Sequence, residues 1–278
     1  MPTPKHDTQT FPSPNTAAIQ ISGVTQHVRG RQDQTLDILA TIDLEVRPGE
    51  FVALVGPSGC GKTTLLNIIS GLILPSSGKV WIFGAPFGNR DHRVGYMFQT
   101  DALLPWRSVL RNVQAGLSLA GVPRREAEQQ ARDMLAQLGL TGFEDHYPAE
   151  LSGGMRQRVS LARTWVTNPD VILMDEPFGA LDSQTKLVIQ ASFLSFWEKH
   201  RKTVVLVTHD LEEAIAMSDR VMVMSTRPGR IKAEYRIDLP RPRSIIELRA
   251  DPRFGSYWRR IWQDLETEAN QAMQGLLG

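Results

Sequence analysis

Residues 51–72 have the sequence FVALVGPSGCGKTTLLNIISGL, and this stretch decides the fold. The apolar run FVALV at 51–55 predicts a buried strand, and TLLNIISGL at 64–72 predicts a helix. Between them, Gly56–Thr63 matches the pattern G-x-x-x-x-G-K-[ST]. Its glycines let backbone N–H groups curl around phosphate oxygens, and the following helix N-terminus favours their negative charge. The sequence therefore predicts a phosphate-binding loop between a buried strand and a helix.

Two side chains of this loop have predicted roles. We expect Lys62 to reach the β- and γ-phosphates and the Thr63 hydroxyl to bind Mg²⁺. A glycine-rich turn that binds nothing is the alternative, and the strand and helix on either side disfavour it. Cys60 occupies a free position of the pattern, where a small filler is favoured over a redox sensor. The predicted nucleotide contacts of the loop are Gly56, Pro57, Ser58, Gly59, Cys60, Gly61, Lys62, Thr63 and Thr64.

Strand-like and helix-like segments alternate along the rest of the chain, which predicts an α/β fold. Between Trp106 and Thr167 the strand signals disappear and helix formers dominate, so a helical subdomain of about residues 106–167 is predicted as an insertion in the sheet. The predicted strands are 42–46, 50–54, 79–82, 94–97, 171–174, 204–208 and 220–224.

The two ends of the chain differ from this pattern. Residues 1–18 are rich in Pro, Thr, Ser and Asn and predict a disordered tail, which leaves residues 19–240 as the main domain. The segment 241–278 is predicted to hold a linker and an amphipathic helix over Pro252–Leu277. Packing of that helix on the protein's own body is favoured over a regulatory or bilayer-associated role. Its apolar face is formed by Phe254, Trp258, Ile261, Trp262 and Leu265, and a mostly solvated face is predicted for Arg241, Arg243, Arg249, Arg253, Arg259 and Arg260.

Composition excludes several classes of protein. The chain has 278 residues, 41% of them hydrophobic, with 31 Lys and Arg against 30 Asp and Glu, so it has no overall basic field for nucleic acid. A single Cys cannot form an internal disulfide. No apolar run approaches the roughly 20 residues that cross a bilayer, and no secretory signal is visible. We therefore expect any work at a membrane to require a partner.

Acidic residues end the predicted strand at 171–174. Asp175 and Glu176 follow it directly, at the edge of a parallel sheet where α/β proteins bind ligands. Asp175 suits Mg²⁺, and Glu176 suits activation or positioning of an attacking water. A solvated acidic strand end is the alternative, and the phosphate loop makes it the weaker one.

A second anion site is possible where Leu151–Met155 has the sequence LSGGM before a helical run. Ser152, Gly153 and Gly154 are placed at a helix N-terminus with free N–H groups. For these residues alone, a simple helix cap with flexible glycines is the favoured interpretation.

These motifs together resemble the ATP-binding-cassette (ABC) ATPases. The phosphate loop, Gln99 in YMFQ, LSGGM, VILMDE, GALD ending at Asp182, and His209 in THD occur in that family's order and spacing over roughly residues 19–235. The resemblance implies a phosphate-loop NTPase core of the RecA-like type, with an antiparallel β-subdomain and the inserted helical subdomain. It also implies hydrolysis of ATP with Mg²⁺.

The resemblance further implies a head-to-tail dimer with a second copy or a homologous ATPase subunit. Each ATP would lie between one subunit's phosphate loop and the other's Ser152, Gly153 and Gly154, with Asp182 passing contacts across the dimer. His209 would contact the γ-phosphate and orient Glu176. Gln99 would sense Mg²⁺ and nucleotide where the sheet meets the helical subdomain.

Within the family, LLPW at 103–106 and STRPGRI at 225–231 resemble the ATPase subunits of nitrate, sulfonate and taurine importers. This implies transmembrane permease subunits, an extracytoplasmic substrate-binding protein, a small anionic solute and a place on the cytoplasmic face of the plasma membrane. LLPW fits either the helical core or the rim of a groove for a permease helix. A cassette acting on DNA or ribosomes is disfavoured, because no second cassette, coiled coil or basic footprint is present. A non-hydrolysing cassette is disfavoured because Lys62, Glu176 and His209 are all in place.

One position departs from the family, whose members usually place an aromatic ring under the adenine. Val28 is predicted there, with His27 as the alternative. Because Val offers no π-stacking, we expect weak discrimination between ATP and GTP.

Overall fold

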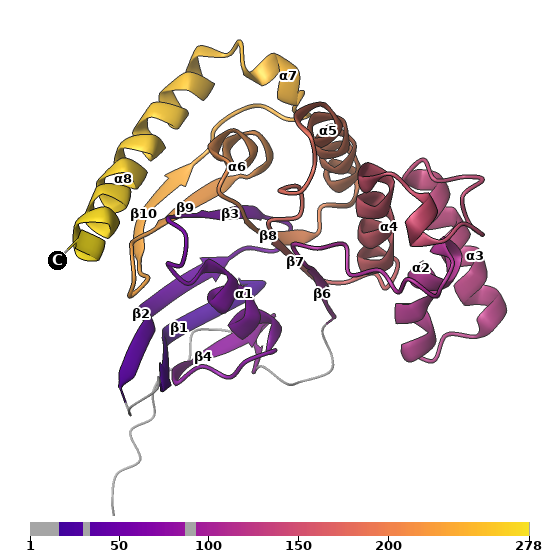
Figure 1. Cartoon of the computed structure of the whole chain (residues 1–278), viewed down its shortest axis with the longest axis horizontal. Helices are drawn as coiled ribbons and strands as arrows, with labels where there is room; N and C mark the ends of the chain where they lie inside the picture. The colour runs from indigo at the N-terminus through magenta and orange to yellow at the C-terminus, as the bar shows by residue number, and fades with distance from the viewer. Residues whose placement is uncertain (1–16, 30–33, 87–92, 278) are drawn as a thin grey trace, which may run out of the picture.

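The computed structural model describes residues 17–29, 34–86 and 93–277, whose strands form two sheets (Figure 1). The smaller sheet is antiparallel, with strand order β2-β1-β4-β5, and the larger has the order β10-β9-β3-β8-β7-β6. In the larger sheet only β10 pairs antiparallel with its neighbour. The strands are β1 Ile19–Arg29, β2 Thr35–Val46, β3 Phe51–Val55, β4 Ser77–Ile82, β5 Ala85–Pro86, β6 Val94–Met97, β7 Val171–Asp175, β8 Thr203–Val207, β9 Arg220–Met224 and β10 Ile231–Arg236.

The helices lie in separate places around these sheets. Figure 1 shows α1 beside the smaller sheet, α5 and α6 near the larger one, α2, α3 and α4 as an arm on one side, and α8 along the opposite side. Between Met97, which ends β6, and Val171, which begins β7, every residue is described and the chain forms helices and no strand. The helices are α1 Lys62–Ser70, α2 Val109–Leu119, α3 Arg124–Gln137, the 3₁₀ turn η1 Pro148–Glu150, α4 Gly153–Trp165, α5 Ser183–His200, α6 Leu211–Met217, α7 Ile245–Leu248 and α8 Pro252–Leu277.

Strand β3 separates two hydrophobic cores. Val52 and Leu54 point into a core shared with the smaller sheet and α1. Phe51, Ala53 and Val55 point into the other core, which extends through the α2–α4 arm and α5 to α8. Both faces of the strand are buried, so its sequence is continuously apolar rather than alternating. The phosphate loop thus follows a strand that is fixed from two sides.

Strand prediction succeeded best in the larger sheet. The segment predicted at 42–46 is the second half of the longer β2, and neither β1 nor β10 is among the predicted strands. The register between β1 and β2 shifts after Ile21, Val24 and Gln26. Such bulges break the period-two alternation from which a strand is predicted. In β10, every second residue is only half-buried, which also weakens the signal.

The structure departs from the predicted tail at the N-terminal end and agrees with the predicted helix at the C-terminal end. Ala18, in the predicted tail, is buried and donates its N–H to the Val46 carbonyl at 2.7 Å. The rest of that prediction, residues 1–16, lies outside the described residues. A helix over Pro252–Leu277 is confirmed as α8, which packs against α6, β9 and β10. None of the described helices combines the length and hydropathy needed to cross a membrane.

The prediction of a solvated arginine face is wrong for two of its six members. Arg243 is 8% exposed, and its guanidinium donates to backbone carbonyls at the end of α6, including Ser218 O at 2.7 Å. Arg241 pairs with Glu198 and Asp219. Carbonyls at a helix C-terminus lack intrahelical donors, so buried arginines can satisfy them here. The other four, Arg249, Arg253, Arg259 and Arg260, are exposed as predicted.

Candidate nucleotide site

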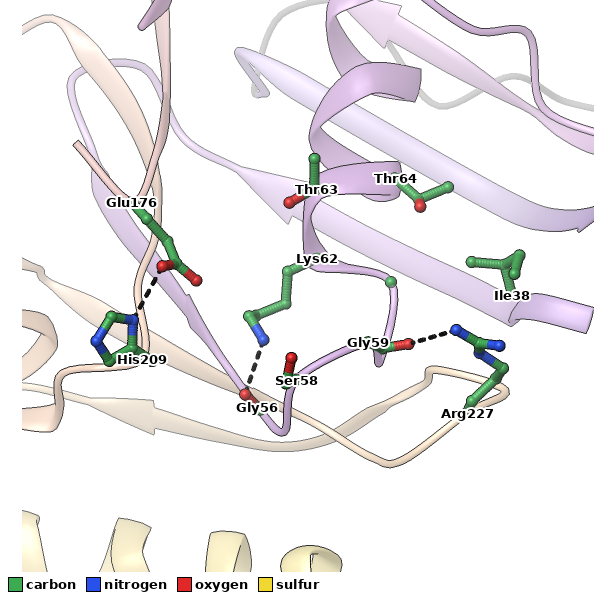
Figure 2. Close-up of a pocket in the computed structure, with 11 residues that line it drawn as sticks. Ile38, Gly56, Ser58, Gly59, Lys62, Thr63, Thr64, Glu176, His209 and Arg227 are labelled. Carbon is green, nitrogen blue, oxygen red and sulfur yellow. Dashed lines mark hydrogen bonds and ion pairs between the residues drawn. The ribbon is translucent and has the colours of Figure 1, made fainter. Parts of the chain in front are cut away.

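The phosphate loop opens into a pocket of about 430 Å³ between β2 of the smaller sheet and the carboxyl ends of strands in the larger sheet (Figure 2). Five separate segments of the chain contribute to it: β2, the loop with the start of α1, and the segments that follow β7, β8 and β9. Its lining residues are Ile38, Gly56, Ser58, Gly59, Gly61, Lys62, Thr63, Thr64, Glu176, His209 and Arg227. At this size and with this polar lining, the pocket suits a small polar ligand.

Backbone geometry explains the loop's glycines. Gly61 has φ 101°, and a Cβ there would lie 2.5 Å from Leu39 Cδ2. A Cβ on Gly56 would lie 3.0 Å from Cys60 Sγ. Cys60 itself is 1% exposed in the core beside α1, and burial raises the pKa of its thiol. The prediction that it fills space is therefore supported by its packing.

Lys62 lies inside the curve of the loop. It is 7% exposed, and its Nζ donates to the carbonyls of Gly56 at 2.7 Å and Pro57 at 2.9 Å. Figure 2 shows its side chain crossing from α1 to the start of the loop. A phosphate in the loop would therefore meet an ammonium group that the loop already positions.

Thr63 and Asp175 bring two oxygen ligands together. The Thr63 hydroxyl donates to Asp175 Oδ1 at 3.0 Å. Burial raises the pKa of Asp175, against the opposing effect of the Thr63 hydrogen bond. Among the described residues, no cluster of three or more His, Cys, Asp or Glu side chains could hold a metal by itself. A hydroxyl and one carboxylate fit Mg²⁺ that takes its remaining ligands from nucleotide phosphates and water.

Glu176 is the centre of a second polar cluster. Its Oε2 lies 3.0 Å from His209 Nδ1 and accepts a weaker hydrogen bond from Gln99 Nε2 at 3.4 Å. The backbone of Glu176 has φ 44°, in the left-handed region that non-glycine residues rarely adopt. Backbone strain of this kind is common at functional sites. The strained backbone of Glu176 therefore fits a functional role in which the direction of its carboxylate is fixed at some cost in stability.

The loop after Gln99 is tied to helix α4. Arg156 Nε lies 3.0 Å from Asp101 Oδ2, and Arg163 donates to the carbonyls of Asp101 and Ala102 at 2.8 and 2.7 Å. Gln157 of the same helix donates to the Pro177 carbonyl, just after Glu176. A shift of α4 would therefore displace both the segment after Gln99 and the segment after Glu176.

Comparison with known proteins decides the family. A family model described as ABC transporter matches residues 39–179. An uncharacterized ABC transporter ATP-binding protein of Methanocaldococcus jannaschii is 47% identical over 236 residues, which cover 85% of this chain and 87% of that protein. The chain belongs to the ABC transporter family. The family resemblance and the ATPase activity expected from the sequence are confirmed.

Two further matches extend the comparison for this ABC ATPase. The taurine import ATP-binding protein TauB of Rhizobium johnstonii is 46% identical over 235 residues, covering 83% of this chain and 90% of that protein. An ATP-binding cassette solved as a dimer in a post-hydrolysis state, bound to ADP and Pi, matches with a TM-score of 0.69 and 32% identity. It covers 80% of this chain and 100% of that one. The predicted fold class is confirmed.

The ABC ATPase's LSGGM segment lies away from its own pocket lining. Ser152 caps α4 by accepting from Met155 N at 3.3 Å, and Asp182 caps α5 by accepting from Thr185 N at 3.0 Å. Gly153 is exposed, whereas Gly154 is buried and a Cβ there would lie 2.6 Å from Thr185 Cγ2. Within one chain these residues cap and pack helices. None of them lines this chain's own pocket, so the predicted contacts with a nucleotide held by a partner subunit stay a prediction.

Three residues of the ABC ATPase's pocket region could not be predicted from the sequence. Ile38 and Arg227 line the pocket, and Gly229 packs on the phosphate loop, where a Cβ would lie 2.0 Å from the Cys60 carbonyl oxygen. The STRPGRI run, which contains Arg227 and Gly229, indicated a resemblance to an importer family but did not indicate that these residues lie at the pocket. Neither Val28 nor His27 is among the lining residues, so their contact with adenine stays a prediction.

Proposed function

We propose that this ATPase drives uptake of a small anionic solute of the nitrate, sulfonate or taurine type through a separate membrane permease. One observation carries the catalytic part: the pocket brings Lys62, Glu176 and His209 together from three distant segments of the chain. Glu176 receives the proton of the attacking water, and His209 orients that carboxylate across 3.0 Å. Lys62 balances charge on the β- and γ-phosphates.

Mg²⁺ belongs to the proposal as a second cofactor. Thr63 and Asp175 would hold the ion, and Gln99, which donates to Glu176 from the loop tied to α4, would add a third oxygen ligand. When bound, the ion neutralises charge that develops on the transferred phosphoryl group. Mg²⁺ is commonly bound by a few protein oxygens together with substrate phosphates and water, so three such residues would suffice.

Nucleotide binding closes a head-to-tail dimer with a second copy or a homologous subunit. Ser152, Gly153 and Asp182 lie at helix N-termini away from the chain's own pocket, where they are accessible to another subunit. The N-termini of α4 and α5 favour the negative charge of a γ-phosphate held by the partner. The structural match with a dimeric cassette supports this arrangement.

The α2–α4 arm meets the permease on the cytoplasmic face of the plasma membrane. Leu103 is buried in the arm's core, whereas Trp106 of the same run is 72% exposed. A large exposed aromatic beside a buried anchor is typical of a protein interface. The substrate class follows the taurine-import relatives, and an extracytoplasmic binding protein would deliver the solute.

Uptake of labelled taurine by host cells lacking this chain tests the proposal. We expect uptake to fall to background, to return with the parent chain or the control Glu45→Gln on the exposed face of β2, and to stay absent with Lys62→Ala. The tagged parent should also purify from detergent-solubilised membranes with a polytopic membrane protein. Sedimentation with ribosomes or nucleic acid instead of a membrane protein would contradict the importer role. Unchanged taurine uptake combined with lost nitrate or sulfonate uptake would reassign the solute within the proposed class.

A further inference from the structure

The pocket has two chemically different ends. Glu176 and His209 lie at one end in Figure 2, and Ile38 and Arg227 lie at the other, with the phosphate loop between them. The attacking water and the γ-phosphate belong at the Glu176 end, because that carboxylate is the base. The nucleoside of a bound nucleotide therefore extends toward Ile38 and Arg227.

Arg227 is held at this end by backbone contacts of its own loop. Gly229 donates to the Ile38 carbonyl at 2.9 Å and accepts from Ala40 N at 3.1 Å, which joins the loop to β2. The guanidinium Nη2 donates to the Gly59 carbonyl at 3.3 Å. The loop after β9 is therefore fixed against both β2 and the phosphate loop.

The C-terminal helix adds a third support. Glu268 of α8 is 4% exposed, and its carboxylate accepts from Thr226 N at 2.8 Å and lies 3.0 Å from Lys232 Nζ. Thr226 directly precedes Arg227 in the chain. A buried carboxylate bonded to a backbone N–H and an ammonium is a strong anchor. Helix α8 therefore fixes the entry to the Arg227 loop.

The guanidinium itself is available to a ligand. Arg227 is exposed, and the described part of the chain places no carboxylate in an ion pair with it. A guanidinium is planar and stacks on aromatic faces, unlike an ammonium group. The flat face of the guanidinium can therefore stack on the base of a nucleotide in place of an aromatic side chain.

Among the described residues that line the pocket, Ile38 forms the side opposite Arg227, which is therefore apolar and carries no aromatic ring. Leu36 lies directly across from Val28 in the β1–β2 pairing, and Leu36 and Ile38 share a face of β2 because side chains alternate along a strand. Val28 and Leu36 are 43% and 44% exposed. These three residues form an aliphatic strip that continues outward from the pocket.

We propose that the guanidinium of Arg227 binds the purine base of the nucleotide, opposite the aliphatic strip of Val28, Leu36 and Ile38, and that Glu268 of the C-terminal helix is a positioning residue for it. The inference rests on the proposed function in that a nucleotide occupies this pocket with its γ-phosphate toward Glu176. A planar cation then replaces the aromatic ring that the strip lacks. The C-terminal helix thereby influences nucleotide affinity from outside the pocket.

Competition binding separates base contacts from phosphate contacts. The affinities of ATP and of inorganic tripolyphosphate are measured by displacement of a fluorescent nucleotide, for the parent, Arg227→Ala, Arg227→Lys and the neighbouring control Arg230→Ala. We expect Arg227→Ala to weaken ATP binding about five- to tenfold, between the values for an exposed and a fully desolvated cation–π contact. Arg227→Lys should also weaken ATP because it keeps the charge and loses the plane. Tripolyphosphate affinity should stay within about twofold of the parent in all of them.

Two results would overturn the assignment. Equal weakening of ATP and tripolyphosphate would place Arg227 on the phosphates, and unchanged ATP affinity in Arg227→Ala would remove it from the site. Lys62→Ala, which should weaken both ligands, shows that the assay detects phosphate contacts. A parent that binds neither ligand would instead refute the proposed function. Thermal unfolding of each variant confirms that it folds.

Glu268→Gln tests the positioning role. We expect a smaller loss of ATP affinity, about two- to threefold, with tripolyphosphate unchanged. In the Arg227→Ala background the same change should have no further effect on ATP, because a positioning residue acts only through the residue it positions. An additional loss in the double variant, or no loss in Glu268→Gln alone, would remove Glu268 from the proposal.

Discussion

The phosphate-loop end of this molecule and its LSGGM end differ in how far their functional side chains are already positioned for a nucleotide. At the first, Lys62, Thr63 and Glu176 already have partners inside the pocket, at hydrogen-bonding distances of 2.7 to 3.0 Å. At the second, Ser152 and Asp182 only cap their own helices. The chain thus preorganises the groups that bind and attack phosphate. In the proposed head-to-tail dimer, a second subunit supplies the other half of the contact.

Glu176→Gln gives the largest expected effect, because it removes the base and leaves both phosphate-binding ends intact. We expect turnover to fall by at least about 100-fold, within the range of general-base catalysis, while ATP binding is kept. Gel filtration with ATP should show an accumulated dimer. Glu126→Gln, on the exposed face of α3, is the control and should behave as the parent. Turnover near that of the parent, or a variant that stays monomeric with ATP, would contradict the role of Glu176.

Gly154→Ala and Gly153→Ala form a matched pair at the LSGGM end. A Cβ at Gly154 would lie 2.6 Å from Thr185 and 3.0 Å from Ile189, whereas the nearest atoms to a Cβ at Gly153 are 3.8 Å away. Overpacking should lower the free energy of unfolding by about 2 kcal/mol in Gly154→Ala. Gly153→Ala should leave it unchanged or slightly raised, since alanine favours a helix. Urea unfolding measures both. Equal stability of the two variants would show that α4 and α5 are less tightly packed than described.

Thr63→Val should affect the phosphate-loop end alone. It removes the hydroxyl that donates to Asp175 and that would bind Mg²⁺, while keeping the side-chain volume. We expect the Mg²⁺ concentration needed for half-maximal ATPase activity to rise about tenfold, comparable to losing one ligand or its oriented neighbour. Thr63→Ser retains the hydroxyl and is the control. A normal Mg²⁺ requirement in Thr63→Val would place the ion elsewhere.

Val28→Tyr gives the smallest expected effect. A ring at this position could stack on the base and strengthen ATP binding several-fold, since an aromatic contact contributes on the order of 1 kcal/mol. The parent should bind ATP and GTP within about tenfold of each other. Nucleotide affinities of the parent, Val28→Tyr and His27→Ala check this. A strong ATP preference that disappears in His27→Ala would identify His27 as the base contact.

Sequence patterns predicted the site where its residues are local in the chain. Gly56–Thr63 and Asp175–Glu176 follow buried strands, so their positions are set by the elements next to them. Arg227 and Ile38 escaped prediction because they meet only through the pairing of the loop after β9 with β2, about 190 residues apart. No local pattern encodes that contact. The same is true of Arg243, whose burial depends on where α6 ends.

Mixing Lys62→Ala with Ser152→Arg tests the division between the two ends most directly. The first variant loses its own phosphate contact, and the second blocks the site of its partner. In a head-to-tail pair made of one of each, both defects fall in one composite site and the other site is intact. We predict that neither variant alone forms a nucleotide-dependent dimer and that the mixture does, as measured by light scattering with ATP. A mixture that shows no restored dimerisation would contradict a site shared between two subunits.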